Sequence, residues 1–377
     1  MMKGKQGKYR GGLWLAAVLM LISLLAGCGG NNNASPSAAE ATAGNAAAAS
    51  PEAAATTEPA AEAVTVKLQL KWVPQAQFAG YFLAQDKGYY AAEGLKVEIL
   101  PGGPDIVPEQ QVAGGSADIG VDWVASLLTS QEQEMPLVQI AQIFQKSGLV
   151  LVSKKEAGIT TPGELKGKKV GNWMGGNEFE ILALFDKYKL DSGKDLNFTK
   201  QGFTMDQFLG GELDAASAMT YNEYQVVLES GIKAEDLSVI DMNDEGVAML
   251  EDNLFANKEW LEGNKETAAK FVRASLKGWA DAIADPEAAV DSVMKLAEAG
   301  STTREHQLTM MTEVAKLIQP EGFDAAKLGY TDAAAFQQTA DIALKFGVIK
   351  TASKVEGAYT NEIVEMAAKI TGNRIPS

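Results

Sequence analysis

The sequence of 377 residues is poor in two side chains on which much protein chemistry depends, since it contains one cysteine and one histidine. The single cysteine, Cys28, excludes an internal disulfide and any metal site built from several cysteines. The single histidine, His306, excludes histidine-rich metal centres and leaves only one candidate for a Ser–His or Cys–His pair. The scarcity of cysteine and histidine therefore argues against many metal-dependent enzymes and against many enzymes with a nucleophilic side chain.

Positive charge is also scarce, because 33 Lys and Arg residues stand against 49 Asp and Glu residues and give a net charge of −16. Such an acidic chain repels phosphate backbones, which argues against broad nucleic-acid binding. Hydrophobic residues make up 46% and charged residues 22%, as in a globular protein. The length predicts about two domains of ordinary size.

The first 27 residues have the composition of an export signal. Residues 1–10 hold four basic residues and no acidic one, and an apolar run follows from Leu13 to Leu25. This run is short for a transmembrane span and fits the hydrophobic region of a signal peptide at residues 1–27. It ends in LAGC, which resembles a bacterial lipobox with Cys28 as the lipidated residue, although a plain signal peptide with an incidental cysteine is the alternative. We therefore expect an extracytoplasmic chain held at the cell membrane by a lipid anchor on Cys28.

Residues 28–63 are predicted to form a disordered tether. After Cys28 they contain no aromatic residue and no Leu, Ile or Met, so they cannot bury enough apolar surface to offset the entropy of ordering. An alanine-rich helix is the competing interpretation, but Gly, Asn, Pro and Thr interrupt the segment too often. Removal of residues 1–27 deletes four positive charges and no negative one, so the mature chain carries −20. The folded part is expected to begin near Val64.

Strand and helix patterns alternate through the rest of the chain. Period-two or apolar runs predict the strands, and apolar residues at helical spacing predict the helices. The predicted strands are residues 64–70, 96–100, 117–121, 137–144, 149–154, 168–173, 196–200 and 215–219. The predicted helices are residues 78–90, 104–112, 125–132, 178–189 and 205–210, then, in a largely helical part after Val247, 258–284, 286–299, 303–318, 332–346 and 361–370. Strands separated by helices imply parallel sheets, so we expect an α/β protein with two lobes and a C-terminal helical tail.

Several motifs make this expectation more specific. The segments KGYYAAEGLKVEI (residues 87–99) and GSADIGV (115–121) resemble those of extracytoplasmic solute-binding proteins of ABC importers. The segments LKWVPQAQFAGY (70–81), GGNE (175–178) and YNEY (221–224) are similar to the branch of that class which shares its fold with the thiamine-pyrimidine synthases of eukaryotes. The resemblance extends roughly from Val64 to Tyr359 and weakens in the C-terminal helices.

The resemblance implies a type II periplasmic binding protein-like fold, in which two lobes clamp a ligand in a cleft. Lobe 1 is expected at residues 64–150 and 250–377, and lobe 2 at residues 151–249. The implied protein is a monomeric binding lipoprotein, without cofactor or metal, that delivers its ligand to a membrane permease and the permease's ATPase. The implied ligand is an aminopyrimidine precursor of thiamine, either formylaminopyrimidine or hydroxymethylpyrimidine. Riboflavin or another flat heterocycle is the alternative.

Trp72 is the first candidate for ligand contact, because it follows a predicted strand and precedes Pro74. Ligands in open α/β sheets bind beyond the C-terminal ends of strands. An indole there offers a stacking face worth about 0.5–1.5 kcal/mol beyond area burial, unless it only covers the sheet edge. Gln77 and Tyr81 lie one turn apart on the next predicted helix and can share a face toward the cleft. Core packing is the strong alternative for Tyr81.

Polar candidates follow two other predicted strands. Asp122 and Trp123 place a carboxylate beside an aromatic ring. The carboxylate can accept hydrogen bonds from an amine or a protonated ring nitrogen, unless it caps the following helix. Gly176, Asn177 and Glu178 begin a helix whose free N–H groups can hold a carbonyl, formyl or phosphate oxygen, unless the turn only admits the helix.

Tyr221, Asn222 and Glu223 follow a further predicted strand and supply a ring, an amide and a carboxylate within three residues. The amide and the carboxylate together can present a donor and an acceptor to a pyrimidine edge. The quoted cleft motifs hold three acidic residues, whereas Lys71 is their one basic residue. That balance argues against a small anion such as a sulfonate or nitrate as the ligand.

An exported pyrimidine-modifying enzyme is the alternative from a different functional class. The synthases that the chain resembles use a histidine as substrate, an iron site and a cysteine-rich segment. Here no cysteine follows Cys28, and His306 lies in a late predicted helix, where we expect a surface or partly packed residue. Only Glu178 or Glu223 beside Asp122 could do acid–base work. We therefore expect a binding protein without catalytic residues.

Overall fold

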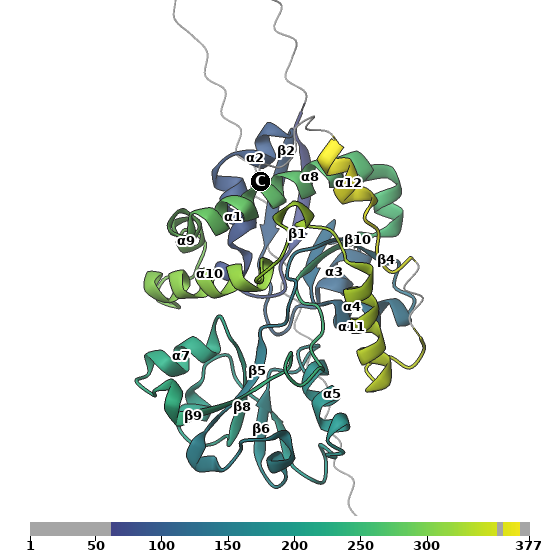
Figure 1. Cartoon of the computed structure of the whole chain (residues 1–377). Coiled ribbons are helices and arrows are strands. Elements are labelled where there is room, and N and C mark those ends of the chain that lie inside the picture. The colour runs from purple at the N-terminus through teal and green to yellow at the C-terminus, as the bar shows by residue number, and fades with distance from the viewer. Residues whose placement is uncertain (1–61, 353–356, 370–377) are drawn as a thin grey trace, which may run out of the picture. The chain divides into compact units, whose positions relative to one another are not determined.

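The structure, a computed structural model, describes residues 62–352 and 357–369 (Figure 1). The expected signal peptide at residues 1–27, the lipidation site Cys28 and nearly all of the tether at residues 28–63 lie outside the described residues. None of the described helices combines the length and the apolar character needed to span a bilayer.

The first of two five-stranded sheets has the strand order β2-β1-β3-β10-β4. β1 pairs in parallel with β2 and β3, whereas β10 is antiparallel to both β3 and β4. We call this sheet, its helices and the C-terminal helices lobe 1. The strands and the helices between them are β1 (Val64–Gln69), η1 (Ala76–Phe78), α1 (Ala79–Asp86), α2 (Tyr89–Ala92), β2 (Leu95–Leu100), α3 (Pro108–Ala113), β3 (Ile119–Asp122), α4 (Val124–Glu132), β4 (Leu137–Gln142) and β10 (Asn253–Asn257).

The second sheet has the order β7-β6-β8-β5-β9, and with its helices it forms lobe 2, which Figure 1 shows below lobe 1. β6 is parallel to β7 and β8, whereas β5 is antiparallel to β8 and β9. Its elements are β5 (Leu149–Lys154), η2 (Lys155–Ala157), η3 (Pro162–Leu165), β6 (Lys169–Asn172), α5 (Phe179–Lys187), β7 (Asn197–Lys200), α6 (Asp206–Leu209), β8 (Ala215–Met219), α7 (Glu223–Glu229), η4 (Ala234–Asp236) and β9 (Leu237–Asp241).

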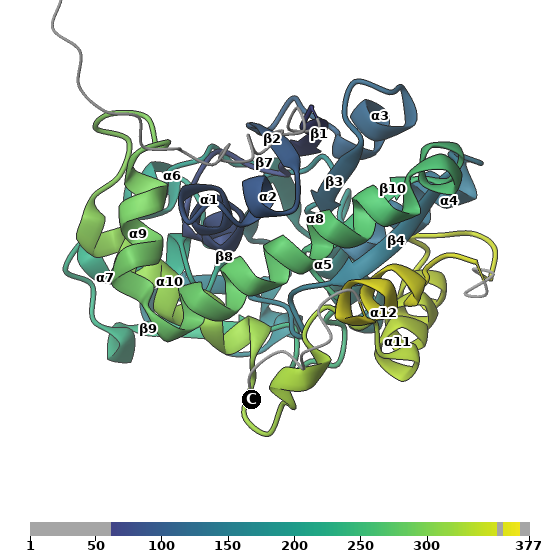
Figure 2. The ribbon, with the colours of Figure 1, turned by 90° about the horizontal axis from the view of Figure 1, so that it is seen from above.

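The C-terminal helices pack on the rest of lobe 1 and also contact lobe 2. The long α8 packs against α1 and α12, as the view from above shows (Figure 2). α10 contacts α7 of lobe 2, and α11 contacts α4 of lobe 1 and α5 of lobe 2. These elements are α8 (Lys258–Ala284), α9 (Pro286–Met294), α10 (Arg304–Ile318), η5 (Ala325–Lys327), α11 (Ala333–Lys345) and α12 (Glu362–Lys369).

The expected α/β architecture with two lobes and a helical tail is confirmed, but the expectation of parallel sheets is only partly correct. Each sheet includes antiparallel pairs, and the interior strand β10 lies where the sequence indicated only helices. Its residues Asn253–Ala256 are all buried, so the strand lacks the alternation that reveals a half-exposed strand. The predicted helix at 104–112 begins only at Pro108, because proline fits the first helical position and disfavours helix in the residue before it.

Two segments carry the chain between the lobes, at residues 143–148 and at residues 242–252. Ile143 and Phe144 in the first segment donate their N–H groups to the Asp252 carbonyl in the second, at 3.2 and 3.3 Å. The two crossings are therefore bonded to each other as well as to their own sheets.

Two buried carboxyl groups reinforce the crossings. Ser147 Oγ lies 2.9 Å from Glu180 Oε2 and 2.7 Å from Glu251 Oε1. The same carboxyls accept backbone N–H groups, Glu180 from Met249 at 3.0 Å and Glu251 from Gly148 at 2.9 Å. One hydroxyl hydrogen cannot serve two carboxylates, so one of the two carboxyls is protonated. Burial raises the pKa of Glu180 to about 8 and also raises that of Glu251, where the neighbouring Glu180 adds to the effect.

We expect Glu180→Gln to make stability less dependent on pH. The amide can accept the Met249 N–H and donate to Ser147 Oγ, so every hydrogen bond is kept. In the wild type the folded state retains a proton that the unfolded chain releases above its ordinary value of 4.5, so the free energy of unfolding falls as pH rises from about 4.5 to about 8. Urea unfolding at about pH 5 and pH 8 should show a smaller fall in the variant.

Glu180→Ala is the comparison, because it leaves the Met249 N–H unpaired and should cost about 1–3 kcal/mol at both pH values. Equal pH dependence of unfolding in wild type and Glu180→Gln would show that Glu180 does not titrate in this window.

Candidate functional site

Three adjoining cavities lie between the lobes, and Trp72 lines all of them. The central cavity has a volume of about 30 Å³, the second about 200 Å³ and the third about 590 Å³. The central cavity is enclosed by residues of both lobes, namely Lys71, Trp72, Gln75, Gln77, Trp123, Trp173, Asn177, Met219, Tyr221, Asn222 and Glu223. Of the eleven residues predicted to contact ligand, seven line this cavity: Trp72, Gln77, Trp123, Asn177, Tyr221, Asn222 and Glu223.

The loop after β1 places Trp72 between the lobes. The Gly102 N–H bonds the Trp72 carbonyl at 2.9 Å, and a side chain at Gly102 would collide, since a Cβ there would lie 2.3 Å from the Leu70 carbonyl oxygen. The half-buried indole meets Phe203 of lobe 2 edge-on, with ring centroids 5.3 Å apart. Trp72 is therefore an inter-lobe contact as well as a cavity wall.

Lys71 and Asp122 form a buried ion pair, with Lys71 Nζ 2.5 Å from Asp122 Oδ1. The same oxygen accepts the Trp123 N–H at 2.6 Å, and Lys71 Nζ lies 4.6 Å from the centroid of the Trp123 ring. Burial alone would lower the pKa of Lys71, but the charge and hydrogen bond of Asp122 outweigh it and raise that pKa. Asp122 lines the second cavity. Its Oδ1 atom, however, is already paired with Lys71, a partner that the sequence analysis did not predict.

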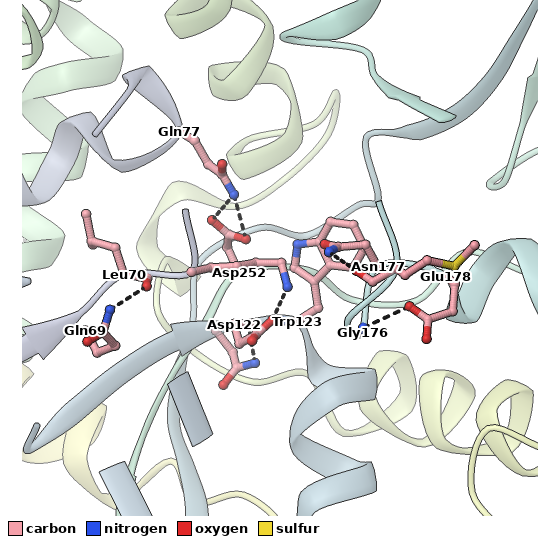
Figure 3. Close-up of polar contacts among 12 residues, drawn as sticks. Gln69, Leu70, Gln77, Asp122, Trp123, Gly176, Asn177, Glu178 and Asp252 are labelled. Atoms are coloured by element: carbon pink, nitrogen blue, oxygen red, sulfur yellow. Dashed lines mark hydrogen bonds and ion pairs between the residues drawn. The ribbon is translucent and has the colours of Figure 1, made fainter. Parts of the chain in front are cut away.

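Gln77 faces the central cavity and is held by Asp252, a residue that the sequence analysis missed (Figure 3). Gln77 Nε2 donates to both carboxylate oxygens of Asp252, at 3.1 and 3.0 Å. Gln77 Oε1 accepts from Gln75 Nε2 at 2.8 Å, which gives a chain of three polar side chains. Burial raises the pKa of Asp252 to about 7, against the opposing effects of the Gln77 hydrogen bond and the Lys71 charge.

The turn at the start of α5 differs from the expected open oxygen site. The Gly176 N–H is already taken by Glu178 Oε2 at 2.8 Å, so the carboxylate of the turn itself occupies the predicted position of a ligand oxygen (Figure 3). Glu178 lines none of the three cavities described, whereas Asn177 lines two of them. Gly176 has φ +100°, and a Cβ there would lie 2.7 Å from Ser126 Oγ of lobe 1. The glycine is thus needed for close approach of the lobes.

Tyr221, Asn222 and Glu223 gather at the start of α7, as expected, and all line the central cavity. The buried Glu223 accepts the Met219 N–H and Asn222 Nδ2, both at 3.0 Å. Burial raises the pKa of Glu223 to about 7, although these hydrogen bonds oppose the rise. A carboxyl in this state can offer either a donor or an acceptor near neutral pH.

Tyr81 does not line any of the three cavities. Its side chain is 1% exposed, and its ring meets Trp279 edge-on at a centroid distance of 5.5 Å. This position corresponds to core packing in lobe 1, because the helix turns the ring away from the cleft and toward α8.

His306 is more deeply buried than expected and reaches the cleft. Its residue exposure is 8%, it lines the third cavity, and its Nε2 lies 2.9 Å from Asn222 Oδ1. The contact joins residues 84 positions apart on α10 and α7, a distance over which local sequence patterns carry no information.

Trp173 is a cavity residue that the sequence analysis missed, although it directly follows β6 as Trp72 follows the first strand region. Trp123 and Trp173 are 5% and 6% exposed, and within the described residues neither indole N–H has a hydrogen-bond acceptor. An unpartnered buried donor costs about 1–3 kcal/mol, which an acceptor atom of a bound ligand would recover. The three indoles, the amide side chains and the carboxyl group that line the central cavity are therefore suited to binding a flat, polar ring. Among the described residues no group of three or more His, Cys, Asp or Glu side chains is placed to hold a metal ion.

The chain is similar in sequence to binding proteins and to a synthase. The family described as NMT1/THI5 like matches residues 75–289. Riboflavin-binding protein RibY of Chloroflexus aurantiacus is 26% identical over 357 residues, covering 92% of this chain and 96% of that protein. The 4-amino-5-hydroxymethyl-2-methylpyrimidine phosphate synthase of Uromyces fabae is 28% identical over 250 residues, covering 63% and 72%. The formylaminopyrimidine-binding protein of Halalkalibacterium halodurans is 26% identical over 234 residues, covering 61% and 70%.

Solved structures share the fold. A protein from Bordetella bronchiseptica matches with a TM-score of 0.63 at 20% identity, covering 83% of this chain and 99% of that one. The periplasmic aliphatic sulphonate binding protein SsuA of Escherichia coli matches with a TM-score of 0.57 at 18% identity, covering 79% and 91%. These likenesses confirm the expected periplasmic binding protein fold.

We expect Gly176→Ala to hold the lobes apart, because its methyl group would meet Ser126 Oγ of lobe 1. Hydrogen exchange followed by mass spectrometry should show faster exchange around Ser126 and in the loop that carries Trp72. Gly211→Ala is the matched control, since Gly211 also has positive φ (+78°) but open space where a Cβ would lie. The double variant Gly176→Ala/Ser126→Ala should return toward wild-type exchange. Equal exchange at the interface in the Gly176 and Gly211 variants would contradict the steric argument.

Proposed function

Because this chain belongs to the NMT1/THI5-like family, we propose that it is the substrate-binding protein of an ABC importer and captures a flat nitrogen heterocycle between its lobes. The observation that carries the proposal is the central cavity, which is lined by Trp72 and Trp123 of lobe 1 and by Trp173 of lobe 2. Indole faces favour stacking on a planar ring. The unpartnered N–H groups of Trp123 and Trp173 favour a ligand with acceptor atoms.

The first ligand that we propose is an aminopyrimidine precursor of thiamine, formylaminopyrimidine or hydroxymethylpyrimidine. Glu223 can accept from the exocyclic amine or, when protonated, donate to a ring nitrogen, and Asn177 and Asn222 add amide groups at the same cavity. A formyl or hydroxyl oxygen can accept an indole N–H. The relative named for formylaminopyrimidine binding supports this choice.

We further propose that the protein is an extracytoplasmic, monomeric lipoprotein. Lipid on Cys28 would anchor it, residues 29–63 would act as the tether, and the ligand-loaded clamp would dock on a permease with its ATPase. The lobes would then comprise residues 64–150 with 250–377, and residues 151–249. The fold shared with periplasmic binding proteins supports an extracytoplasmic site of action.

The proposed activity is binding without chemical change. Some relatives are named as synthases, so a pyrimidine-modifying enzyme is the competing function. The only cysteine in the sequence is Cys28, and both ring nitrogens of His306 are engaged, by Asn222 and Glu229. The buried carboxyls Glu223 and Asp252 are held by backbone or amide donors. This arrangement favours a clamp over a reaction centre.

Riboflavin is the second candidate, and the 200 Å³ cavity beside Trp72 favours it. Glu109 and Ser126 line this cavity, and among the described residues Glu109 Oε1 and Ser126 Oγ are buried without a hydrogen-bond partner. A hydroxylated side chain on the heterocycle could pair with both groups. The relative named for riboflavin binding is matched over 96% of its length, which supports this alternative.

We expect Trp72→Ala to weaken ligand binding by more than about 1 kcal/mol, roughly fivefold, through loss of ring stacking. Calorimetric titration of the full chain with hydroxymethylpyrimidine, formylaminopyrimidine and riboflavin measures the change. Tyr188→Ala is the control, since Tyr188 is exposed on lobe 2 and lines none of the three cavities. Unchanged affinity in folded Trp72→Ala would exclude a stacking role. Mass spectrometry of the released ligand would show a new mass if the protein were an enzyme.

Ser126→Ala separates the two candidate ligands. If riboflavin is the ligand, the variant should bind it about fivefold more weakly, because its hydroxylated chain loses one hydrogen bond. Lumichrome, which has the same ring system without that chain, should bind equally to wild type and variant. Aminopyrimidine affinity should not change if that ligand fills only the central cavity. Equal riboflavin affinity in both proteins would remove the second cavity from the binding site.

A further inference from the structure

The turn between β6 and α5 carries two of the residues that line the central cavity, Trp173 and Asn177. The three residues between them, Met174, Gly175 and Gly176, have positive φ angles of 63°, 71° and 100°. The two glycines adopt this conformation at little cost, whereas Met174 has a Cβ that makes it strained. Such strain persists only where the surrounding structure holds the backbone in place. The side chains that hold this turn therefore bear on the binding site.

One buried side chain, that of Asn172 at the end of β6, holds the turn. Asn172 Oδ1 accepts the Met174 N–H at 2.7 Å. Asn172 Nδ2 donates to the Asn177 carbonyl oxygen at 3.1 Å and to Ser217 Oγ at 2.9 Å. Ser217 lies on the neighbouring strand β8 and donates its own hydroxyl to the Gly171 carbonyl oxygen at 2.9 Å. One amide group thus fastens both ends of the turn to two strands of the sheet of lobe 2.

The side-chain amide of Asn177 has a fixed orientation. Asn177 Nδ2 donates to the Met174 carbonyl oxygen at 2.8 Å. A carbonyl oxygen only accepts hydrogen bonds, so the amide nitrogen must face it and the amide oxygen must point elsewhere. Among the described residues none donates a hydrogen bond to Asn177 Oδ1. Asn177 is 8% exposed and lines both the central and the second cavity, so this oxygen is the group that Asn177 offers to a ligand.

The amide of Gln75 gives lobe 1 a matching acceptor. Asp252 binds Gln77 Nε2, so Gln77 Oε1 is the acceptor for Gln75 Nε2, at 2.8 Å. Gln75 Oε1 then has no donor among the described residues, and Gln75 also lines the central cavity. The cavity therefore offers an amide oxygen from each lobe, beside the indole N–H groups of Trp123 and Trp173. A ring that fits this cavity needs hydrogen-bond donors as well as acceptors.

We propose that Asn172 is a positioning residue that holds Asn177 Oδ1 as the acceptor for an N–H donor of the bound heterocycle. Lobe 2 then selects a ring that bears an amine or a ring N–H over the same ring without that donor. The proposal rests on the proposed function, because it names the part of the ligand that the same site would recognise. A ligand without the donor would leave the buried oxygen unpaired, which weakens binding. The exocyclic amine of the aminopyrimidines and the ring N–H of riboflavin both meet the requirement.

Asn172→Ala tests the positioning role, with Gln201→Ala as the matched control. Gln201 is also buried, and its side chain bonds the Ser217 backbone N–H at 3.1 Å and carbonyl oxygen at 2.8 Å instead of the turn. Both variants lose buried hydrogen bonds to Ser217, so both should unfold at a lower urea concentration than wild type. Calorimetric titration of the full chain with hydroxymethylpyrimidine or riboflavin should show an affinity reduced about fivefold in Asn172→Ala and unchanged in Gln201→Ala. Equal affinities of the two variants would overturn the proposal.

An analogue without the donor tests the acceptor itself. Hydrogen replaces the amine in the pyrimidine analogue, and a methyl group replaces the hydrogen of the ring N–H in the riboflavin analogue. Wild type should bind the parent compound about tenfold more tightly than the analogue, whereas Asn172→Ala should show a preference about fivefold smaller. The same preference in both proteins would contradict a role of Asn172 in presenting the acceptor.

If neither parent compound binds, the proposed ligands fail, and hydrogen exchange of the free chain decides the role of Asn172. Faster exchange at residues 173–177 in Asn172→Ala than in Gln201→Ala would support that role, and equal exchange there would overturn it.

Discussion

The buried ion pair between Lys71 and Asp122 is the interaction on which the geometry of the cleft depends. Removal of either partner would leave an unpaired buried charge, a change that typically costs about 3–5 kcal/mol. The pair fastens the loop after β1 to the end of β3, so it sets the positions of Trp72 and Trp123 relative to each other. Asn253 adds a hydrogen bond to the Asp122 carbonyl at 2.7 Å, which attaches the same point to β10 and hence to the second crossing.

The part of the site that could be predicted from sequence is the part that follows parallel strands. Trp72, Trp123 and Asn222 each stand just beyond a strand that its own residues reveal, and the rule that ligands bind at C-terminal strand ends brings them together. Trp173 directly follows β6, so the same rule could have predicted it as a site residue. The Gly176 N–H, which was expected to be free for a ligand oxygen, is bonded by Glu178, because sequence position does not show that a carboxylate can bond the N–H of its own turn.

The rest depends on contacts across long stretches of chain. Asp252 meets Gln77 from 175 residues away, and His306 meets Asn222 from 84 residues away, so no local pattern connects them. β10 was missed for a related reason, since a strand buried on both faces between two antiparallel neighbours shows no alternation. The features that the sequence did not reveal, β10, Asp252 and His306, all lie in the part of the chain that returns from lobe 2 to lobe 1. This part adds a strand to the sheet of lobe 1 and polar side chains to the cleft.

Buried carboxyl groups with raised pKa values recur through the cleft and the crossings, and Glu180, Glu223 and Asp252 share burial as the main cause. Clusters of such groups often mark catalytic sites. Here each carboxyl is held by backbone or amide donors, which fixes its position and leaves it poised between a donor and an acceptor near neutral pH. Glu223, the one of the three that lines the described cavities, can pair with the mixed donor and acceptor edge of a heterocycle without enclosing an unpaired charge. Raised pKa values of buried carboxyl groups are therefore also compatible with reversible binding. A carboxyl that is neutral near pH 7 can be buried against a polar ring without the large cost of burying an unpaired charge.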